Sequence, residues 1–450
     1  MTTRRKPCLP LLRTAILTIA LAATTAGAIG GALAQDQDAE LELELEAKLD
    51  RIARETAELR ELPWLAEIDD VLVSQDELLA MMPALIAEEI DSEDAVAQSR
   101  SLAALGLIPA GTDLLDLTMR LMSEQAAGFY DPLSDEMLVL FDGNSELTEY
   151  FYAHEVIHAL QDAHLDPDDL MEDLTALNSD QTLATLALYE GDAVTGSAVY
   201  LERHPTLALA LLREVDRDFP VMDGAPASVG IVLLFPYTSG ATFVDRLLAE
   251  GGWDAVNAAY TDMPASTEQI LHPLKYLERD EPSLIALPDP TSALGAGWRV
   301  VDENTLGELQ TAVLLANFDP GEGFNGITGD IALPESVRNA AAGWDGDRFA
   351  LWETGDGERE TLVWRSVWDT PQDARAFSRA LAQFGNGRWN SDFNGESPDD
   401  VALATPEIAA RILLDGQEVL YVQAPNLALA DAALAALQTA PPPNPTPGTD

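Results

Sequence analysis

The feature that most constrains the fold of this chain is HEVIHALQDAH, residues 154 to 164, which holds three of its five histidines. Residues four apart on an α-helix project from the same face, so the imidazoles of His154 and His158 can bind one metal ion together. Val156 and Leu160 make another side of the same helix apolar. The pattern predicts a helix that is buried from several directions and carries two polar side chains inward.

Glu155 directly follows the first of these histidines, beside the face that the two imidazoles share. A carboxylate at this position can take a proton from a metal-activated water and pass it to a leaving amine. The HExxH pattern therefore predicts a hydrolytic metal site with His154 and His158 as ligands, Glu155 as general base, and one Zn²⁺ per chain.

A catalytic zinc needs a third protein ligand, and His164 is one candidate because HExxHxxxxxH has the spacing of metzincin peptidases. Those enzymes have a glycine three residues after the second histidine, where the helix stops. This chain has Gln161 there, so the helix is expected to continue and to turn His164 away from the ligand face. We expect His164 to cap the C-terminal end of the helix instead.

Glu190, in the stretch LALYEGDA, is the rival third ligand. An acidic side chain in the middle of an apolar helix is costly to bury unless it is paired or bound to a metal. The sequence around it predicts a second buried helix that is capped near Asn178, and the two helices together would form a His₂Glu site with an open fourth position. Asp192 faces roughly the opposite way, and its role is either to support the site or to lie partly exposed.

Residues 128 to 140, just before the histidine helix, contain turn formers between two short β-prone runs. They predict a hairpin that ends in a strand over residues 137 to 141. Asn144 and Ser145 then offer a cap for the helix that carries the histidines.

Composition changes along the chain indicate an exported protein of several parts. The start is basic, an apolar run follows, and small residues stand at 32 to 34. This is typical of a cleaved signal peptide, with an uncleaved membrane anchor as the alternative. We therefore expect secretion or a place in the cell envelope or periplasm. The predicted parts are a signal peptide (1–34), an acidic helical segment (35–102), the unit with the histidine motif (103–288), a smaller, separate α+β unit (289–438) and a disordered Pro-rich tail (439–450).

Charge and cysteine content limit the partners. The chain has 25 Lys and Arg against 77 Asp and Glu, for a net charge of −52. Such a surface repels nucleic acid and anionic membranes, so neither is an expected partner. The only cysteine, Cys8, lies in the predicted signal peptide. Any metal site must therefore use histidine and carboxylate ligands.

GFYDP, HEVIHALQD, YEGDA and STEQILHPLKY follow one another between about residues 120 and 280. This order resembles a set of exported bacterial and archaeal proteins, and HExxH with a downstream Glu is similar to the gluzincin branch of the zincin metallopeptidases. The resemblance implies His154, His158 and Glu190 as zinc ligands and Glu155 as general base. It also implies an α+β fold, with a mainly helical zincin-like domain that contains a short β-sheet.

In that fold the strand before the active-site helix pairs with an extended substrate, and residues 137 to 141 stand at the matching place. The sequence departs from the family pattern at one position. Many gluzincins have an Asp four residues after the ligand Glu, where it orients a ligand histidine, and this chain has Val194 there.

The stretch STEQILHPLKY supplies His272, Lys275 and Tyr276, which have suitable chemistry for stabilising an oxyanion. We predict this role for His272 and Tyr276; a loop histidine and a surface lysine are the alternative. The sequence thus favours an exported zinc endopeptidase acting on peptide or protein. The alternatives are an inactive zincin-fold binding protein of the cell envelope and a metzincin-type peptidase that uses His164.

Overall fold

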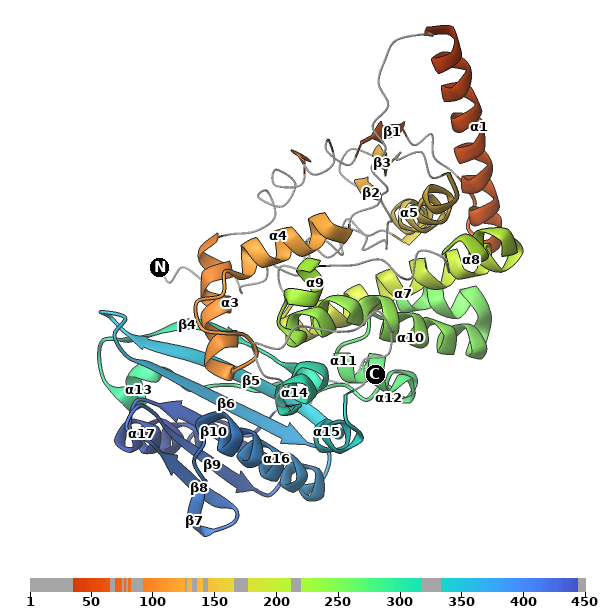
Figure 1. The fold of residues 1–450 in the computed structure, drawn as a ribbon. Coiled ribbons are helices and arrows are strands. Elements are labelled where there is room, and N and C mark those ends of the chain that lie inside the picture. Colours follow the sequence, from red (N-terminus) through yellow and green to blue (C-terminus); the bar gives the residue numbers. More distant parts are fainter. Residues whose placement is uncertain are drawn as a thin grey trace, which may run out of the picture.

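The computed structural model describes residues 35–64, 69–74, 92–125, 128–131, 136–140, 145–165, 177–211, 220–316 and 333–443, with residues 77, 80 and 81. The predicted signal peptide (1–34) and residues 444–450 of the predicted tail lie outside this part. The fold is α+β, as predicted: a mainly helical part with a small sheet is followed by a larger antiparallel sheet with helices on both faces (Figure 1).

Three long helices form the region around the histidine motif, which itself lies in the second of them. They are α1 (Gln35–Arg60), α5 (Ser145–Leu165) and α7 (Ser179–Arg203). The predicted cap of α7 is confirmed, since Asn178 and Gln181 form a reciprocal capping box. Helix α1 presents Leu49, Ile52 and Ala53 to a core that it shares with α5 and α7. These positions recur at helical spacing, so α1 is an integral part of the fold.

Helix α10 (Ala227–Ala259) packs along α7. Non-helical backbone at Gly251 and Gly252 kinks α10. Within the described part of the chain, α10 alone is long and apolar enough to cross a membrane, and half of that apolar window is buried inside the protein. Its packing against α7 is that of a core helix.

The small sheet has the strand order β1-β3-β2, with β1 (Asp69–Val73) parallel and β2 (Gly128–Asp131) antiparallel to β3 (Glu136–Leu140). The predicted hairpin is confirmed. Two other expectations were wrong. Segment 35–102 is not wholly helical, because it contributes β1 to this sheet. The predicted substrate-pairing strand, residues 137–141, corresponds to β3, which is the central strand and has both edges paired; residue 141 lies outside the described residues.

The large sheet has seven strands in the order β4-β5-β6-β10-β9-β8-β7, and all neighbours are antiparallel. Helix α16 (Pro371–Trp389) packs on one face, and α17 (Leu427–Leu437) packs on the other. The α+β character predicted for residues 289–438 is confirmed by these strands and helices. The strands are β4 (Trp298–Asn304), β5 (Trp344–Thr354), β6 (Glu360–Trp368), β7 (Asn394–Ser397), β8 (Asp400–Ala404), β9 (Ala409–Asp415) and β10 (Glu418–Ala424).

The two parts share one core. A single hydrophobic cluster contains Leu186 and Phe243 from the helical part together with Leu309 and Trp364 from beyond residue 289. The boundary predicted there does not separate two cores.

The other helices that the structure describes are shorter. They are α3 (Ser92–Leu105), α4 (Leu114–Gln125), α8 (Pro205–Leu211), α9 (Pro220–Gly224), α11 (Thr267–Leu271), α12 (Pro273–Glu278), α13 (Pro290–Leu294), α14 (Gly307–Leu315) and α15 (Glu335–Ala341).

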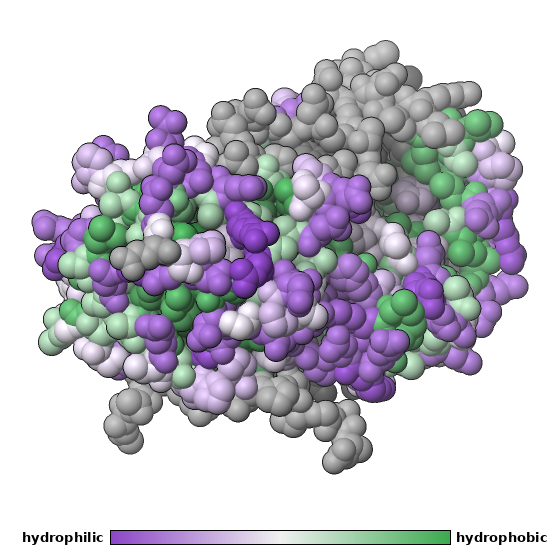
Figure 2. Space-filling model, turned by 90° about the horizontal axis from the view of Figure 1, so that it is seen from below, coloured by the Kyte–Doolittle hydropathy of each residue, from purple (hydrophilic) through white to green (hydrophobic). Residues whose placement is uncertain are grey.

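The face drawn in Figure 2 is largely hydrophilic, with smaller hydrophobic areas between the polar ones. This is the surface expected of a chain with a net charge of −52.

Candidate metal centre

His154 and His158 lie on the buried side of α5, where they are 4% and 1% exposed. Tyr152, Val156 and Ile157 pack in the core that α5 shares with α1 and α7. The helix is therefore enclosed on several sides, as its sequence predicted, and its two ligand-type side chains are almost completely buried.

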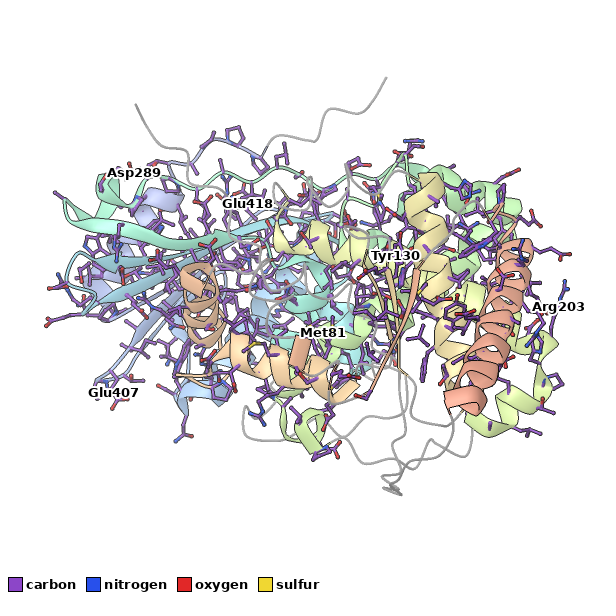
Figure 3. The ribbon with its side chains drawn as sticks, turned by 90° about the horizontal axis from the view of Figure 1, so that it is seen from above. Met81, Tyr130, Arg203, Asp289, Glu407 and Glu418 are labelled. Atoms are coloured by element: carbon purple, nitrogen blue, oxygen red, sulfur yellow. The ribbon has the colours of Figure 1, made fainter. Side chains whose placement is uncertain are left out.

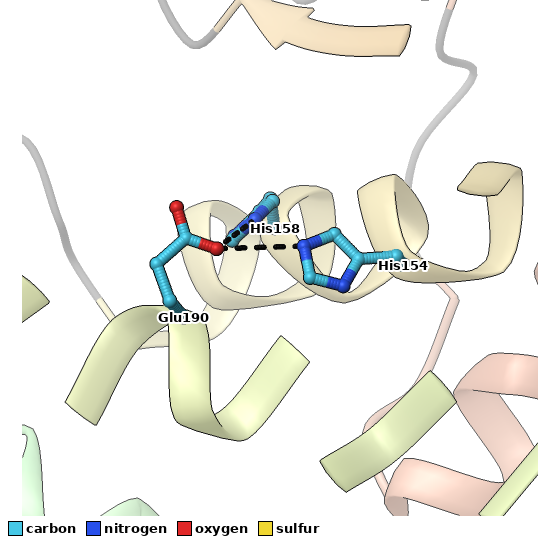
Figure 4. A group of neighbouring side chains, drawn as sticks. All are labelled: His154, His158 and Glu190. Atoms are coloured by element: carbon cyan, nitrogen blue, oxygen red, sulfur yellow. Dashed lines mark ion pairs between the residues drawn. The ribbon is translucent and has the colours of Figure 1, made fainter. Parts of the chain in front are cut away.

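Glu190 reaches the same place from α7 and is fully buried (Figure 4). Its Oε2 atom lies 3.4 Å from His154 Nε2 and 3.4 Å from His158 Nε2. One ligand atom from each residue lies within 4.8 Å of the others. Ligands about 2.1 Å from a tetrahedral zinc stand about 3.4 Å apart. The two distances from Glu190 Oε2 to the imidazole nitrogens match that separation.

The three converging atoms also make no hydrogen bonds. Among the described residues, His154 Nε2, His158 Nε2 and Glu190 Oε2 have no hydrogen-bond partner. Buried polar atoms are normally satisfied, so three such atoms pointing at one another need an explanation. A metal ion between them supplies one, and the donor set of two imidazoles and a carboxylate fits zinc.

The charges of the three residues are complementary. Burial alone would raise the pKa of Glu190, but His158 and His154 outweigh it and hold that pKa below its usual value. Burial disfavours the protonated imidazole of His158, yet Glu190, Glu155 and Gln161 raise its pKa to about 9. A proton and a metal ion therefore compete for the same imidazole nitrogen.

The close approach of α10 to α7 fixes the position of Glu190. A Cβ atom at Gly240 would lie 2.1 Å from the carbonyl oxygen of Ala187, and one at Gly191 would lie 2.2 Å from the backbone of Gly240. Only glycine permits this contact. It brings Tyr237 of α10 to the carboxylate, where its hydroxyl donates to Glu190 Oε1 at 3.0 Å. The other oxygen, Oε2, is the one that faces the imidazoles.

Gln161 orients His158. The Gln161 Nε2 atom contacts two acceptors, the carbonyl oxygen of Tyr189 and Asp192 Oδ2, so its Oε1 atom must be the one that lies 2.8 Å from His158 Nδ1. Nδ1 of His158 therefore donates its hydrogen to Gln161, and in the neutral ring this leaves Nε2 with the lone pair that a metal ion would bind.

Asp192 anchors this arrangement and is fully buried. It accepts hydrogen bonds from Arg60 Nε at 2.7 Å, Arg60 Nη2 at 2.9 Å and the hydroxyl of Tyr260 at 2.8 Å. The Arg60 guanidinium also stacks on Trp253, 4.2 Å from the ring centre. Of the two roles left open for Asp192, the structure shows support of the site, through Gln161. The sequence analysis did not identify Arg60, Gln161, Tyr237 or Tyr260 as parts of the site.

Glu155 is 2% exposed, and its Oε2 atom accepts a hydrogen bond from the backbone N–H of Tyr130 at 3.1 Å. Tyr130 lies in the edge strand β2, near the middle of the molecule in Figure 3. Its own hydroxyl donates to Asp162 Oδ2 at 2.7 Å. These contacts attach the small sheet to the histidine helix.

His164 does not join the group. Helix α5 continues past Gln161 to Leu165, and His164 Nε2 lies 2.6 Å from the carbonyl oxygen of Pro63. The expected continuation of the helix is confirmed. His164 lies in the last turn of α5, at the C-terminal end of the helix as expected, and its ring contacts the segment after α1.

His272, Lys275 and Tyr276 make their hydrogen bonds and ion pairs with other residues. His272 Nε2 lies 2.9 Å from Glu308 Oε1, the Lys275 ammonium contacts Glu268 and Asp369, and the hydroxyl of Tyr276 donates to the carbonyl oxygen of Asp262. The oxyanion role predicted for His272 and Tyr276 stays a prediction.

A family model for a domain of unknown function, DUF8575, matches residues 297–434, the part of the chain that contains the large sheet. No curated protein and no solved structure is similar enough to this chain to count as a match.

Proposed function

We propose that this protein is an exported zinc metallopeptidase of the gluzincin type with a zincin-like helical domain. The observation that carries the proposal is the convergence of the Nε2 atoms of His154 and His158 on Glu190 Oε2, with Glu155 as the next residue after His154. A zinc ion held by these ligands would lower the pKa of a water molecule and polarise a peptide carbonyl.

In this proposal the protein's own groups prepare the reaction. Glu155 takes the proton of the attacking water and gives it to the leaving amine, while the Tyr130 N–H holds one oxygen of Glu155 in place. Gln161 keeps His158 in the tautomer that has a free Nε2. Tyr237 holds the second oxygen of Glu190, so the carboxylate offers one oxygen to the metal.

An extended peptide is the proposed substrate. Strand β3 has both edges paired, so it cannot receive another strand. Of the two edge strands, β2 is the one that touches Glu155 through Tyr130. We therefore assign to β2 the contact with substrate that the sequence suggested for residues 137–141.

Cleavage of unstructured protein substrates such as casein by zinc-loaded protein tests the proposal. Glu155→Gln is the matched control, since it keeps the size of the side chain and removes the base. We expect cleavage by the wild type and at least about a 100-fold lower rate for Glu155→Gln. Equal rates for the two proteins, or no cleavage by a zinc-loaded wild type across a diverse peptide library, would contradict the proposed activity.

A further inference from the structure

Glu308 is a second buried carboxylate with an unused oxygen. It lies in the first turn of α14 and is 4% exposed. Its Oε1 atom is 2.9 Å from His272 Nε2, and its Oε2 atom has no hydrogen-bond partner among the described residues. A buried carboxylate oxygen without a donor is unfavourable unless a ligand completes it.

Glu308 lines a cavity of about 710 Å³ between α10, α11, α14 and α15. This volume is in the range of pockets that bind small molecules or side chains. Tyr237 lines the same cavity, and its hydroxyl lies 3.0 Å from the metal-ligand candidate Glu190. Tyr237 therefore belongs both to the wall of this cavity and to the surroundings of the candidate metal centre.

The basic residues near Glu308 are His272, Lys275 and Arg338, and His272 is the one in contact with its carboxylate. Lys275 is occupied by Glu268 at 2.7 Å, Asp369 at 2.7 Å and Asp280 at 3.2 Å. Arg338, which also lines the cavity, is exposed and makes no ion pair within the described part of the chain. Burial raises the pKa of Glu308, and His272 is the group that opposes this rise most strongly.

We propose that Glu308 Oε2 binds a positively charged group of the substrate, a guanidinium or an ammonium, in this cavity. The inference rests on the proposed peptidase function and specifies its substrate: a peptide with a basic side chain near the scissile bond. A guanidinium or ammonium supplies the hydrogen-bond donors that Oε2 lacks, and it offsets the acidic excess around α14.

Equilibrium binding to zinc-loaded Glu155→Gln protein tests this without cleavage. The probes are acetyl-Ala-Ala-Arg-Ala-Ala-amide and the same peptide with citrulline, which keeps the shape of arginine and removes its charge. We expect the arginine peptide to bind at least 10-fold more tightly, and the preference to disappear in Glu308→Gln. The exposed Glu335 lines the same cavity, so Glu335→Gln is the matched control and should keep the preference.

Equal binding of the two peptides by protein with Glu308 intact would overturn the inference, whether or not Glu308→Gln folds. A peptide of five alanines with a free amino terminus distinguishes the source of the charge. If this peptide binds more tightly than its acetylated form, and if the difference disappears in Glu308→Gln, the site is assigned to an N-terminal ammonium. Loss of a second zinc equivalent in Glu308→Gln would show a metal site instead. The zinc content of the wild type and its cleavage of protein substrates test the peptidase proposal separately.

Discussion

Arg60 Nε donates to Asp192 Oδ1 at 2.7 Å, although 132 residues separate the two in the chain and both side chains are completely buried. Asp192 in turn holds Gln161, which holds His158. The N-terminal helix α1 therefore supports the candidate metal centre through three successive contacts.

Removal of Arg60 should destabilise the whole protein. Arg60→Met leaves the Asp192 carboxylate buried without its guanidinium, which costs about 3–5 kcal/mol in comparable buried pairs. We expect the free energy of unfolding in urea to fall by that amount. The double variant Arg60→Met/Asp192→Leu should recover part of the loss, because no charge remains buried. A single variant within about 0.5 kcal/mol of the wild type would show that the pair contributes little.

Gln161→Met should weaken zinc binding while the three ligands remain. The variant removes the acceptor at His158 Nδ1, so the imidazole loses its fixed tautomer and orientation. Loss of such a supporting hydrogen bond typically costs 10–100-fold in metal affinity, and competition with a fluorescent chelator measures it. His164→Ala, on the same helix, should keep the affinity of the wild type. If both variants bind zinc as the wild type does, Gln161 has no part in orienting the ligand.

The three residues of the candidate metal centre could be predicted from sequence because their signals are local. His154 and His158 are four apart on one helix, and Glu190 is an acid within an apolar helix. Arg60 and Tyr237 give no such signal, since their partners are distant in the chain and their own neighbours are ordinary helix residues. The central position of β3 depends on β1, a five-residue strand that lies between helices in the chain and that the sequence analysis did not identify. Its pairing is a tertiary contact that the local pattern does not encode.

Gly240→Ala should disrupt the contact between α10 and α7. The added methyl group would lie 2.1 Å from the carbonyl oxygen of Ala187, so the two helix backbones must move apart. We expect a loss of about 2–3 kcal/mol in the free energy of unfolding, and weaker zinc binding because Glu190 and Tyr237 separate. Gly224→Ala is the control, as its added Cβ meets nothing within 4 Å. Similar stabilities for the two variants would contradict the close packing.

Asp180 should make stability depend on pH. Burial raises its pKa to about 8, although hydrogen bonds from Thr267 act in the opposite direction. The folded state therefore holds a proton that the unfolded state releases near pH 4. The favourable contribution of this group is complete below pH 4, and it declines as the pH rises towards 8.

For one group the decline cannot exceed about 1.4 kcal/mol per pH unit. Asp180→Asn should flatten the fall in unfolding free energy between pH 5 and pH 8, measured by urea denaturation. Asp254→Asn, at an exposed position of α10, should leave the slope unchanged. An Asp180→Asn slope equal to that of the wild type would contradict the raised pKa.

Zinc content per chain, by elemental analysis of the purified wild type, Glu190→Ala and His164→Ala, decides whether His154, His158 and Glu190 form a metal site. We predict one zinc in the wild type and in His164→Ala, and loss of zinc in Glu190→Ala. Loss in His164→Ala with retention in Glu190→Ala would contradict this prediction, and so would a wild type that takes up no zinc after reloading.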